Sequence, residues 1–149
     1  NNYSNIISDA KEGDNIAYGD IDIDVIFPFD EEREQFENIN NESIVLLVDI
    51  KGYQILLMGD AEQEIEKEIL GEWDLGEVYI LKVGHHCSRT ATSNMFLKTI
   101  SPDLAICSCG ERNKFGHPHY ETLEKFQKAN VQYLVTYEEG DILINFVDL

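Results

Sequence analysis

The chain has 149 residues, of which 43% are hydrophobic and 10% aromatic, a composition that suits one domain with a sizeable core and excludes a disordered polymer. Its formal net charge of -18 excludes a uniformly basic surface for nucleic acids or anionic membranes. No apolar run approaches the roughly 20 residues of a membrane span, and the first residues lack a signal-peptide pattern, so we expect a soluble segment without membrane contact of its own. Because the sequence does not begin with Met, we expect a piece of a longer protein.

The charge is unevenly distributed along the chain. Residues 1–42 carry twelve acidic and two basic side chains, whereas residues 82–128 carry four acidic and seven basic ones. The basic stretch suits an anionic substrate, although lysines scattered over solvated helix faces explain it equally well.

The first half of the sequence predicts strands and an acidic loop. Alternating apolar residues over 21–27 indicate a half-buried strand that ends before a proline. The mostly charged and amide residues of 30–42 predict a surface loop. Two apolar runs, over 43–50 and 53–58, are joined by a Lys-Gly pair, which predicts a tight hairpin.

The rest of the chain alternates helices with strands. Helices are predicted over 61–70, closed by Gly71, over 92–100, with Met95, Phe96, Thr99 and Ile100 on the buried face, and over 118–129, with Leu123 and Phe126 buried and Asn130 after its end. Strands are predicted over 78–83, 104–107, 131–137 and 141–147. We therefore expect an α/β fold (α+β mixed), with a mixed sheet and flanking helices.

All four histidines lie in two short loops that each follow a predicted strand. One loop contains His85 and His86, and the other contains His117 and His119. Asp60 follows a third strand, and open α/β folds place their ligands at the carboxyl ends of strands. Imidazole and carboxylate together suit zinc, manganese or iron, and two such ions could activate water and stabilise a phosphoryl oxygen. The pattern predicts a site for hydrolysis by a divalent metal.

Single residues of this site have alternative roles. Asp60 stands three residues before Gln63, as an N-cap with its capping-box partner would, but its coincidence with the histidine loops favours a metal ligand. Neighbours on a regular strand point to opposite sides, so we assign only His85 as a metal ligand. His86 is then a proton donor or substrate contact, with a plain hydrogen-bonded histidine as the alternative.

The second histidine loop is predicted to contact phosphate. His117 and His119 flank Pro118 at the start of a helix, where unpaired amides attract anions, so we assign both to catalysis or phosphate contact. A metal role and a simple helix-start role are the alternatives. A further hydroxyl-rich loop suits phosphate oxygens, although such residues also populate ordinary loops. Its predicted substrate contacts are Ser88, Arg89, Thr90 and Ser93.

Three cysteines are too few and too odd in number for a disulfide framework. Cys107 and Cys109 could share one face as a metal or redox pair, but we predict a buried, inert pair. A cysteine protease with Cys87 as nucleophile is disfavoured because no glycine-rich oxyanion segment surrounds it. Walker, Rossmann, helix-turn-helix and zinc-finger patterns are absent from the sequence.

Four segments in sequence order carry a resemblance to a known family: Asn41–Val48, Leu57–Glu62, Leu81–Ser93 and Gly116–His119. They are similar to the metallo-β-lactamase-fold domain of ComEC-type competence proteins and to its stand-alone hydrolase relatives, from about residue 14 onward. The resemblance implies that Asp60 bridges two metals and that His85 completes the ligand set of the second half. It also implies that the Ser88–Ser93 loop, His117 and His119 line the same cleft.

The chain departs from the family pattern in two ways. The first-half signature, a His-x-(His or Asp)-x-Asp-His loop that supplies most of the metal ligands, is absent. Cys87 stands where the family usually has Gly, and Cys107 and Cys109 have no counterpart, so Cys87 is either an added soft ligand or, as we favour, a tolerated substitution. Residues 1–149 therefore correspond to one partial domain, the C-terminal half of an αββα sandwich. We expect the missing first half, or a second copy, to cover its apolar sheet face.

The leading hypothesis is a metal-dependent hydrolase module, a phosphodiesterase or nuclease of a DNA-uptake protein, with zinc or manganese as cofactor. The isolated chain is expected to be inactive because its ligand set is incomplete. A stand-alone hydrolase of a small anionic ester suits the acidic charge better, and a non-catalytic structural module is the third alternative. A ComEC-like parent would make this a soluble domain of a bacterial membrane protein, and a stand-alone enzyme would be cytoplasmic.

Overall fold

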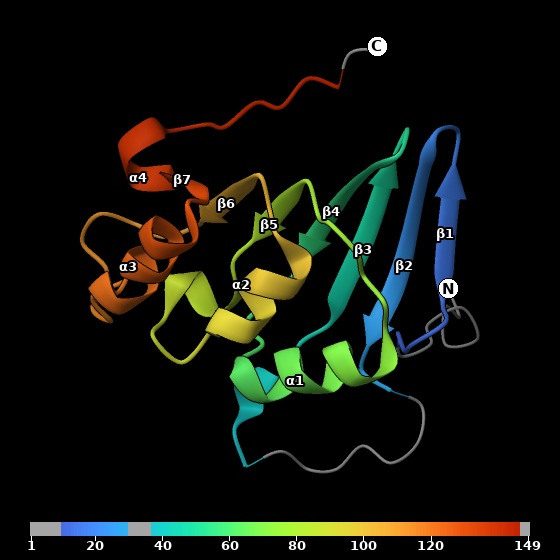
Figure 1. Ribbon diagram of the computed structural model, residues 1–149, viewed down its shortest axis with the longest axis horizontal. Coiled ribbons are helices and arrows are strands. Elements are labelled where there is room, and N and C mark those ends of the chain that lie inside the picture. The colour runs from blue at the N-terminus through green and yellow to red at the C-terminus, as the bar shows by residue number, and fades with distance from the viewer. Residues whose placement is uncertain (1–9, 30–36, 147–149) are drawn as a thin grey trace, which may run out of the picture.

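Strands form one seven-stranded mixed sheet in the described part of the chain, and their spatial order follows the sequence (Figure 1). The computed structural model describes residues 10–29 and 37–146. The strands are β1 (Asn15–Tyr18), β2 (Ile21–Phe27), β3 (Val45–Ile50), β4 (Tyr53–Leu57), β5 (Ile80–Lys82), β6 (Leu104–Cys107) and β7 (Gln132–Val135). Strands β1 to β4 pair antiparallel and β4 to β7 pair parallel, which confirms the predicted mixed sheet.

The β3–β4 hairpin lies where the sequence predicts it. Lys51 and Gly52 connect the strands with φ angles of 56° and 87°, and two left-handed residues give the two-residue turn whose twist matches that of the strands. The Gly52 amide also donates to the Asp49 carboxylate at 2.8 Å. Because β4 pairs in parallel with β5, and β5 with β6, the carboxyl ends of these three strands lie along one edge of the sheet.

Three of the described helices cover one face of the sheet, namely α1 (Gln63–Glu72), α2 (Asn94–Ile100) and α3 (Tyr120–Ala129). The sheet contributes Leu47, Leu56, Leu81 and Ala105, in register, to the core between the layers. The helices contribute Ile65, Ile69, Phe96, Ile100 and Phe126. Burial of each large apolar side chain stabilises the fold by about 1.5–3 kcal/mol. This layer fixes the helix starts at the carboxyl edge of β4, β5 and β6.

The opposite face of the sheet carries a second apolar row. Val48, Ile55, Ile80 and Leu104 lie in register there, and none of them joins the core cluster beneath the helices. Ile55 and Leu104 are half-buried, whereas Val48 and Ile80 are buried, with 8% and 2% exposure. The ring of Phe146 packs against Tyr53 and Tyr79 at 5.1 and 6.3 Å between centroids. Within the described ranges, this face is therefore apolar and partly exposed to solvent.

Several predicted boundaries of the helices are wrong. Helix α1 continues through Gly71 and ends at Glu72, and α3 begins at Tyr120 rather than Pro118. In α2 the buried residues are Phe96, Leu97 and Ile100, whereas Met95 is 59% exposed, because the helix is rotated about one position from the predicted face. Phe126 is buried as predicted, and Asn130 ends α3 with a left-handed φ of 56°.

Strand predictions fail at the two ends of the sheet. The short strand β1 pairs only with β2 and buries no side chain, so it has no apolar alternation to detect. At the other end a single helical turn, α4 (Thr136–Glu139), follows β7 and ends with the C-cap Gly140, whose φ is 73°. Residues 141–146 form no strand, and Leu143 is 83% exposed. Residue 147, the end of that predicted strand, lies outside the described residues.

Residues 37–42 do not form the plain surface loop that composition predicts, and residues 30–36 of that loop lie outside the described ranges. Ile39–Glu42 form a 3-10 helix, η1, and Asn41 in it is 1% exposed. Asn41 is buried because its amide donates to the Glu64 carboxylate and accepts from the Glu62 backbone N–H. None of the helices in the described ranges has the length and apolar character that spanning a membrane requires.

Candidate functional site

The predicted convergence of Asp60 with the four histidines is present at the carboxyl edge of β4, β5 and β6. The His85 backbone N–H donates to the Gly59 carbonyl at 3.2 Å, which joins the turn after β4 to the turn after β5. The ring of His117 lies 5.3 Å from that of His85 and 4.7 Å from that of His119, measured between centroids. Two loops more than 25 residues apart in sequence therefore build one histidine cluster.

The turn after β5 is a 3-10 turn, η2 (Gly84–Cys87), and not the end of a regular strand. Gly84 is required there, because a Cβ atom at this position would lie 2.3 Å from the Ala61 carbonyl oxygen. His85 and His86 have left-handed φ angles of 44° and 54°. The argument that strand alternation sends His85 and His86 to opposite sides is therefore wrong, since neither residue has strand geometry.

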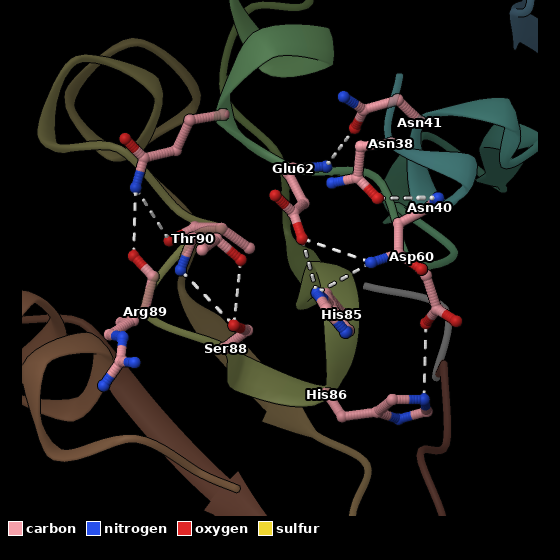
Figure 2. A network of polar contacts seen from close by, with 12 residues as sticks. Asn38, Asn40, Asn41, Asp60, Glu62, His85, His86, Ser88, Arg89 and Thr90 are labelled. Carbon is pink, nitrogen blue, oxygen red and sulfur yellow. Dashed lines mark hydrogen bonds and ion pairs between the residues drawn. The ribbon is translucent and has the colours of Figure 1, made fainter. Parts of the chain in front are cut away.

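His85 is oriented by Glu62 (Figure 2). Its Nδ1 lies 2.8 Å from the Glu62 carboxylate, which also accepts from the Asn40 side chain at 3.3 Å. Burial would raise the pKa of Glu62, but hydrogen bonds from Thr90, Asn40, Asn38 and His85 lower it overall. A carboxylate whose pKa is lowered stays ionised and accepts a hydrogen bond from His85 Nδ1–H. The Nε2 lone pair is then free, which is the arrangement of metal-binding histidines.

Asp60 pairs with His86 rather than with His85. The Asp60 carboxylate lies 3.3 Å from His86 Nε2, and His86 Nδ1 lies 2.7 Å from the Ser108 carbonyl (Figure 2). A carbonyl only accepts hydrogen bonds, so Nδ1 carries a proton, and in the neutral ring Nε2 is a bare acceptor. Two acceptor atoms then face each other, an arrangement that needs a proton or a cation between them. The N-cap alternative for Asp60 is wrong, because α1 begins after Glu62.

The second histidine loop supplies a hydrogen-bond donor. The Arg89 backbone N–H donates to His119 Nδ1 at 3.0 Å, so the neutral His119 ring carries its proton on Nε2. His117 is 8% exposed, and burial together with the neighbouring histidines lowers its pKa. His119 is the residue before α3, although its side chain caps no amide of that helix. The predicted catalytic roles of His117 and His119 stay predictions.

In the predicted substrate loop, two residues are exposed and the hydroxyls of the other two form hydrogen bonds within the protein. Arg89 and Thr90 are exposed, whereas Ser88 is 4% exposed and its hydroxyl meets that of Thr90 at 2.9 Å. The Ser93 hydroxyl accepts from the Phe96 N–H at 3.1 Å and caps α2. Arg89 and Thr90 are therefore the members of this loop best placed for a ligand, and substrate contact remains a prediction for all four.

Glu66 of helix α1 supports this loop through hydrogen bonds. It is 1% exposed, and its carboxylate accepts from the backbone N–H groups of Thr92 and Ser93. Burial raises the pKa of Glu66, and these hydrogen bonds, which lower it, offset only part of that effect. Gln63 and Lys125 donate to the Ala91 carbonyl at 3.3 and 3.1 Å. Nothing in the local sequence distinguishes Glu66 from its solvated neighbours, because its partners lie 26 or more residues away.

Lys82 is a further residue that sequence reasoning did not assign to the site. Its Nζ donates to the Gly59 carbonyl at 2.8 Å, the same oxygen that accepts from His85. Burial lowers the pKa of Lys82, and the nearby Asp60 carboxylate acts in the opposite direction. Lys82 therefore fixes the turn that carries Asp60 and adds a cation to one side of the cluster.

Cys87 and Cys107 form a disulfide, with their Cα atoms 5.4 Å apart. The prediction that Cys107 and Cys109 form a buried, inert pair is wrong, because the sheet register places Cys107 beside the turn after β5, where it bonds to Cys87. Cys109 is free and half-buried, and burial raises its pKa. Bonded to Cys107, Cys87 is neither a nucleophile nor a metal ligand. The disulfide fixes the η2 turn to β6.

The described residues do not by themselves fit a metal ion. In residues 10–29 and 37–146, no three His, Cys, Asp or Glu side chains have an arrangement that could hold one. The donor atoms that approach each other are those of Asp60 and His86, at 3.3 Å, and the His85 ring lies 6.5 Å from that of His86 between centroids.

Comparison with known proteins gives relatives for most of the chain. It is 33% identical over 136 residues to ComE operon protein 3 of Bacillus subtilis, an alignment that covers 91% of this chain. It is 37% identical over 107 residues, 72% of the chain, to recombination protein 2 of Haemophilus influenzae, and 31% identical over 116 residues, 76% of the chain, to competence protein ComA of Neisseria gonorrhoeae. These relatives indicate a family of competence proteins. The chain spans 17%, 13% and 16% of their respective lengths, and no protein-family model matches it.

Proposed function

We propose that the chain is part of a metal-dependent hydrolase domain in a ComEC-like DNA-uptake protein, and that the domain cleaves phosphodiester bonds. The observation that carries the proposal is the approach of the Asp60 carboxylate to His86 Nε2, at 3.3 Å, in the same cluster as a His85 whose Nδ1 contacts Glu62. The names of the relatives support a role in competence. Hydrolysis is inferred from the chemistry of the donor set.

Asp60 and His85 would contribute to a zinc or manganese site together with ligands from outside the described residues, and His86 would serve as a proton donor or substrate contact. When bound, such a metal polarises a phosphoryl oxygen and lowers the pKa of bound water. The chain's own residues orient the imidazoles and contact the substrate. Glu62 and the Ser108 carbonyl orient the two imidazoles, His119 presents an Nε2–H to a substrate oxygen, and Arg89 offers a charge-assisted contact to phosphate.

The second apolar face of the sheet is the proposed docking surface for the rest of the domain. Packing of another sheet on Val48, Ile55, Ile80 and Leu104 would complete an αββα sandwich of the metallo-β-lactamase kind. The added sheet would come from elsewhere in the same protein or from a second copy. It would also bring the missing ligands to the edge where Asp60 lies.

Metal content and phosphodiesterase activity of the longest natural protein that contains this chain test the proposal. Asp60→Asn and His85→Gln each remove one proposed ligand while keeping side-chain size, so we expect both to lose bound metal and at least about 100-fold in kcat/KM on a DNA strand. Asp22→Asn, an exposed carboxylate on β2, is the matched control. If both ligand variants keep wild-type metal content and activity, the chain is not part of a metal-dependent hydrolase.

A small anionic ester is the second candidate substrate, and the net charge of -18 favours it because that charge repels a polyanion. The same assay with a small phosphodiester in place of DNA separates the candidates. Preference for the small ester at physiological salt would assign the site to that chemistry.

A further inference from the structure

Two large aromatic side chains stand exposed beside the histidine cluster. Phe115 is 63% exposed and Tyr120 is 70% exposed. The Phe115 ring lies nearly parallel to that of His117, with 5.8 Å between centroids and 23° between planes. Tyr120 follows His119 directly, as the first residue of α3. The Phe115 ring therefore lies beside the histidine cluster, and Tyr120 is the immediate sequence neighbour of His119 in that cluster.

The loop that carries Phe115 is held in place by hydrogen bonds to one half-buried amide side chain, that of Asn113. The Asn113 side chain donates to the carbonyls of Gly110 and His117, at 2.8 and 2.6 Å. It also accepts from the backbone N–H groups of Phe115 and His117, at 3.2 and 2.9 Å. With all four bonds made, the loop has a defined conformation in which the Phe115 ring points outward. The exposed face of this ring is therefore available to a ligand.

Basic side chains lie near Phe115 in space and near Tyr120 through the neighbouring His119. Lys114 Nζ lies 4.9 Å from the centroid of the Phe115 ring, and Arg89 is tied through its backbone to His119. Arg112 belongs to the same loop as Lys114. Aromatic rings flanked by cations are the elements with which proteins bind single strands, since every base has a face to stack and every phosphate a charge to pair. The bases of a duplex are already stacked on one another and present no such face.

We propose that Phe115 and Tyr120 form a stacking platform for the bases of a single-stranded nucleic acid, whose backbone passes Lys114 and Arg89 toward the histidine cluster. The platform supplies base contacts, and the cations supply phosphate contacts. The direction of the strand toward the reacting phosphodiester rests on the proposed function. Binding on the platform does not, because it needs no metal.

Fluorescence anisotropy on the full chain tests the platform. A labelled thymidine strand of about 15 nucleotides is compared with an abasic strand of equal length and with its duplex, in the presence of a chelator so that no hydrolysis occurs. Phe115→Leu and Tyr120→Leu keep an apolar side chain but remove the ring. We expect each to weaken binding of the thymidine strand about tenfold and to leave binding of the abasic strand unchanged.

Tyr18→Leu is the matched control, since Tyr18 is 83% exposed on the distant edge strand β1, and we expect no change in affinity. Equal affinity of the wild-type chain for the thymidine and abasic strands, or a preference for the duplex, would overturn the platform. If the ligand variants keep wild-type metal content and activity while the wild-type chain still binds the thymidine strand more tightly than the abasic strand, the proposed function is refuted and the stacking platform is supported.

Discussion

Reduction of the Cys87–Cys107 disulfide is predicted to lower the free energy of unfolding by about 3 kcal/mol. The two cysteines are 20 residues apart, and cross-linking a loop of that length removes about 11 cal/mol/K of chain entropy from the unfolded state, or about 3 kcal/mol at 25 °C. Both cysteines are fully buried, so the bond opens only to reductant that reaches an unfolded or partly opened chain.

Urea unfolding followed by fluorescence of Trp73, the single tryptophan, measures this loss. With a urea m-value of about 1–3 kcal/mol/M, the midpoint should fall by about 1–3 M on full reduction. A Cys87→Ala and Cys107→Ala double variant should unfold at a similarly reduced midpoint and show no response to reductant. Cys109→Ala, which removes the free cysteine, should respond as the wild type does.

The disulfide should also stiffen the histidine turn. The Cys87 carbonyl accepts from the His119 N–H at 3.0 Å, so loosening of Cys87 disturbs both histidine loops. We expect amide exchange of residues 85–88 to accelerate on reduction more than that of the β3–β4 hairpin. An unchanged urea midpoint in protein whose thiols are shown by mass spectrometry to be free would refute the entropy argument.

Two further predictions concern the supports of the site. Gly84→Ala would place a Cβ against the Ala61 carbonyl and should lower the free energy of unfolding by about 1–3 kcal/mol. Gly71→Ala, where the added Cβ meets no neighbouring atom, should be neutral or stabilising. Equal urea midpoints for the two variants would contradict this prediction. Burial raises the pKa of Glu66 above its ordinary 4.5, so the folded chain binds this proton more tightly than the unfolded chain, and wild-type stability relative to Glu66→Gln should fall as pH rises above about 4.5. A stability difference that stays constant from about pH 4 to pH 8 would show that Glu66 is not perturbed by burial.

Local patterns in the sequence predicted most of the elements and the position of the histidine cluster. The hairpin at Lys51-Gly52 follows from turn chemistry, and the strands β2, β5 and β6 follow from short apolar runs. The convergence of Asp60 with the histidines follows from their places after strands of one sheet. Each of these signals is contained in fewer than about 12 consecutive residues, which is the range over which periodicity and turn residues act.

The tertiary structure alone decided which side chains pair within the site. Glu62 with His85, Asp60 with His86, and Cys87 with Cys107 are separated by 20 to 26 residues. Glu66 resembles its solvated neighbours in sequence yet is buried beneath the loop it supports. These pairings depend on the register of β4, β5 and β6 and on left-handed turns at His85 and His86, and no periodicity encodes either. The sequence by itself thus determined which residue types gather at one edge of the sheet, and packing between distant segments decided how their atoms face each other.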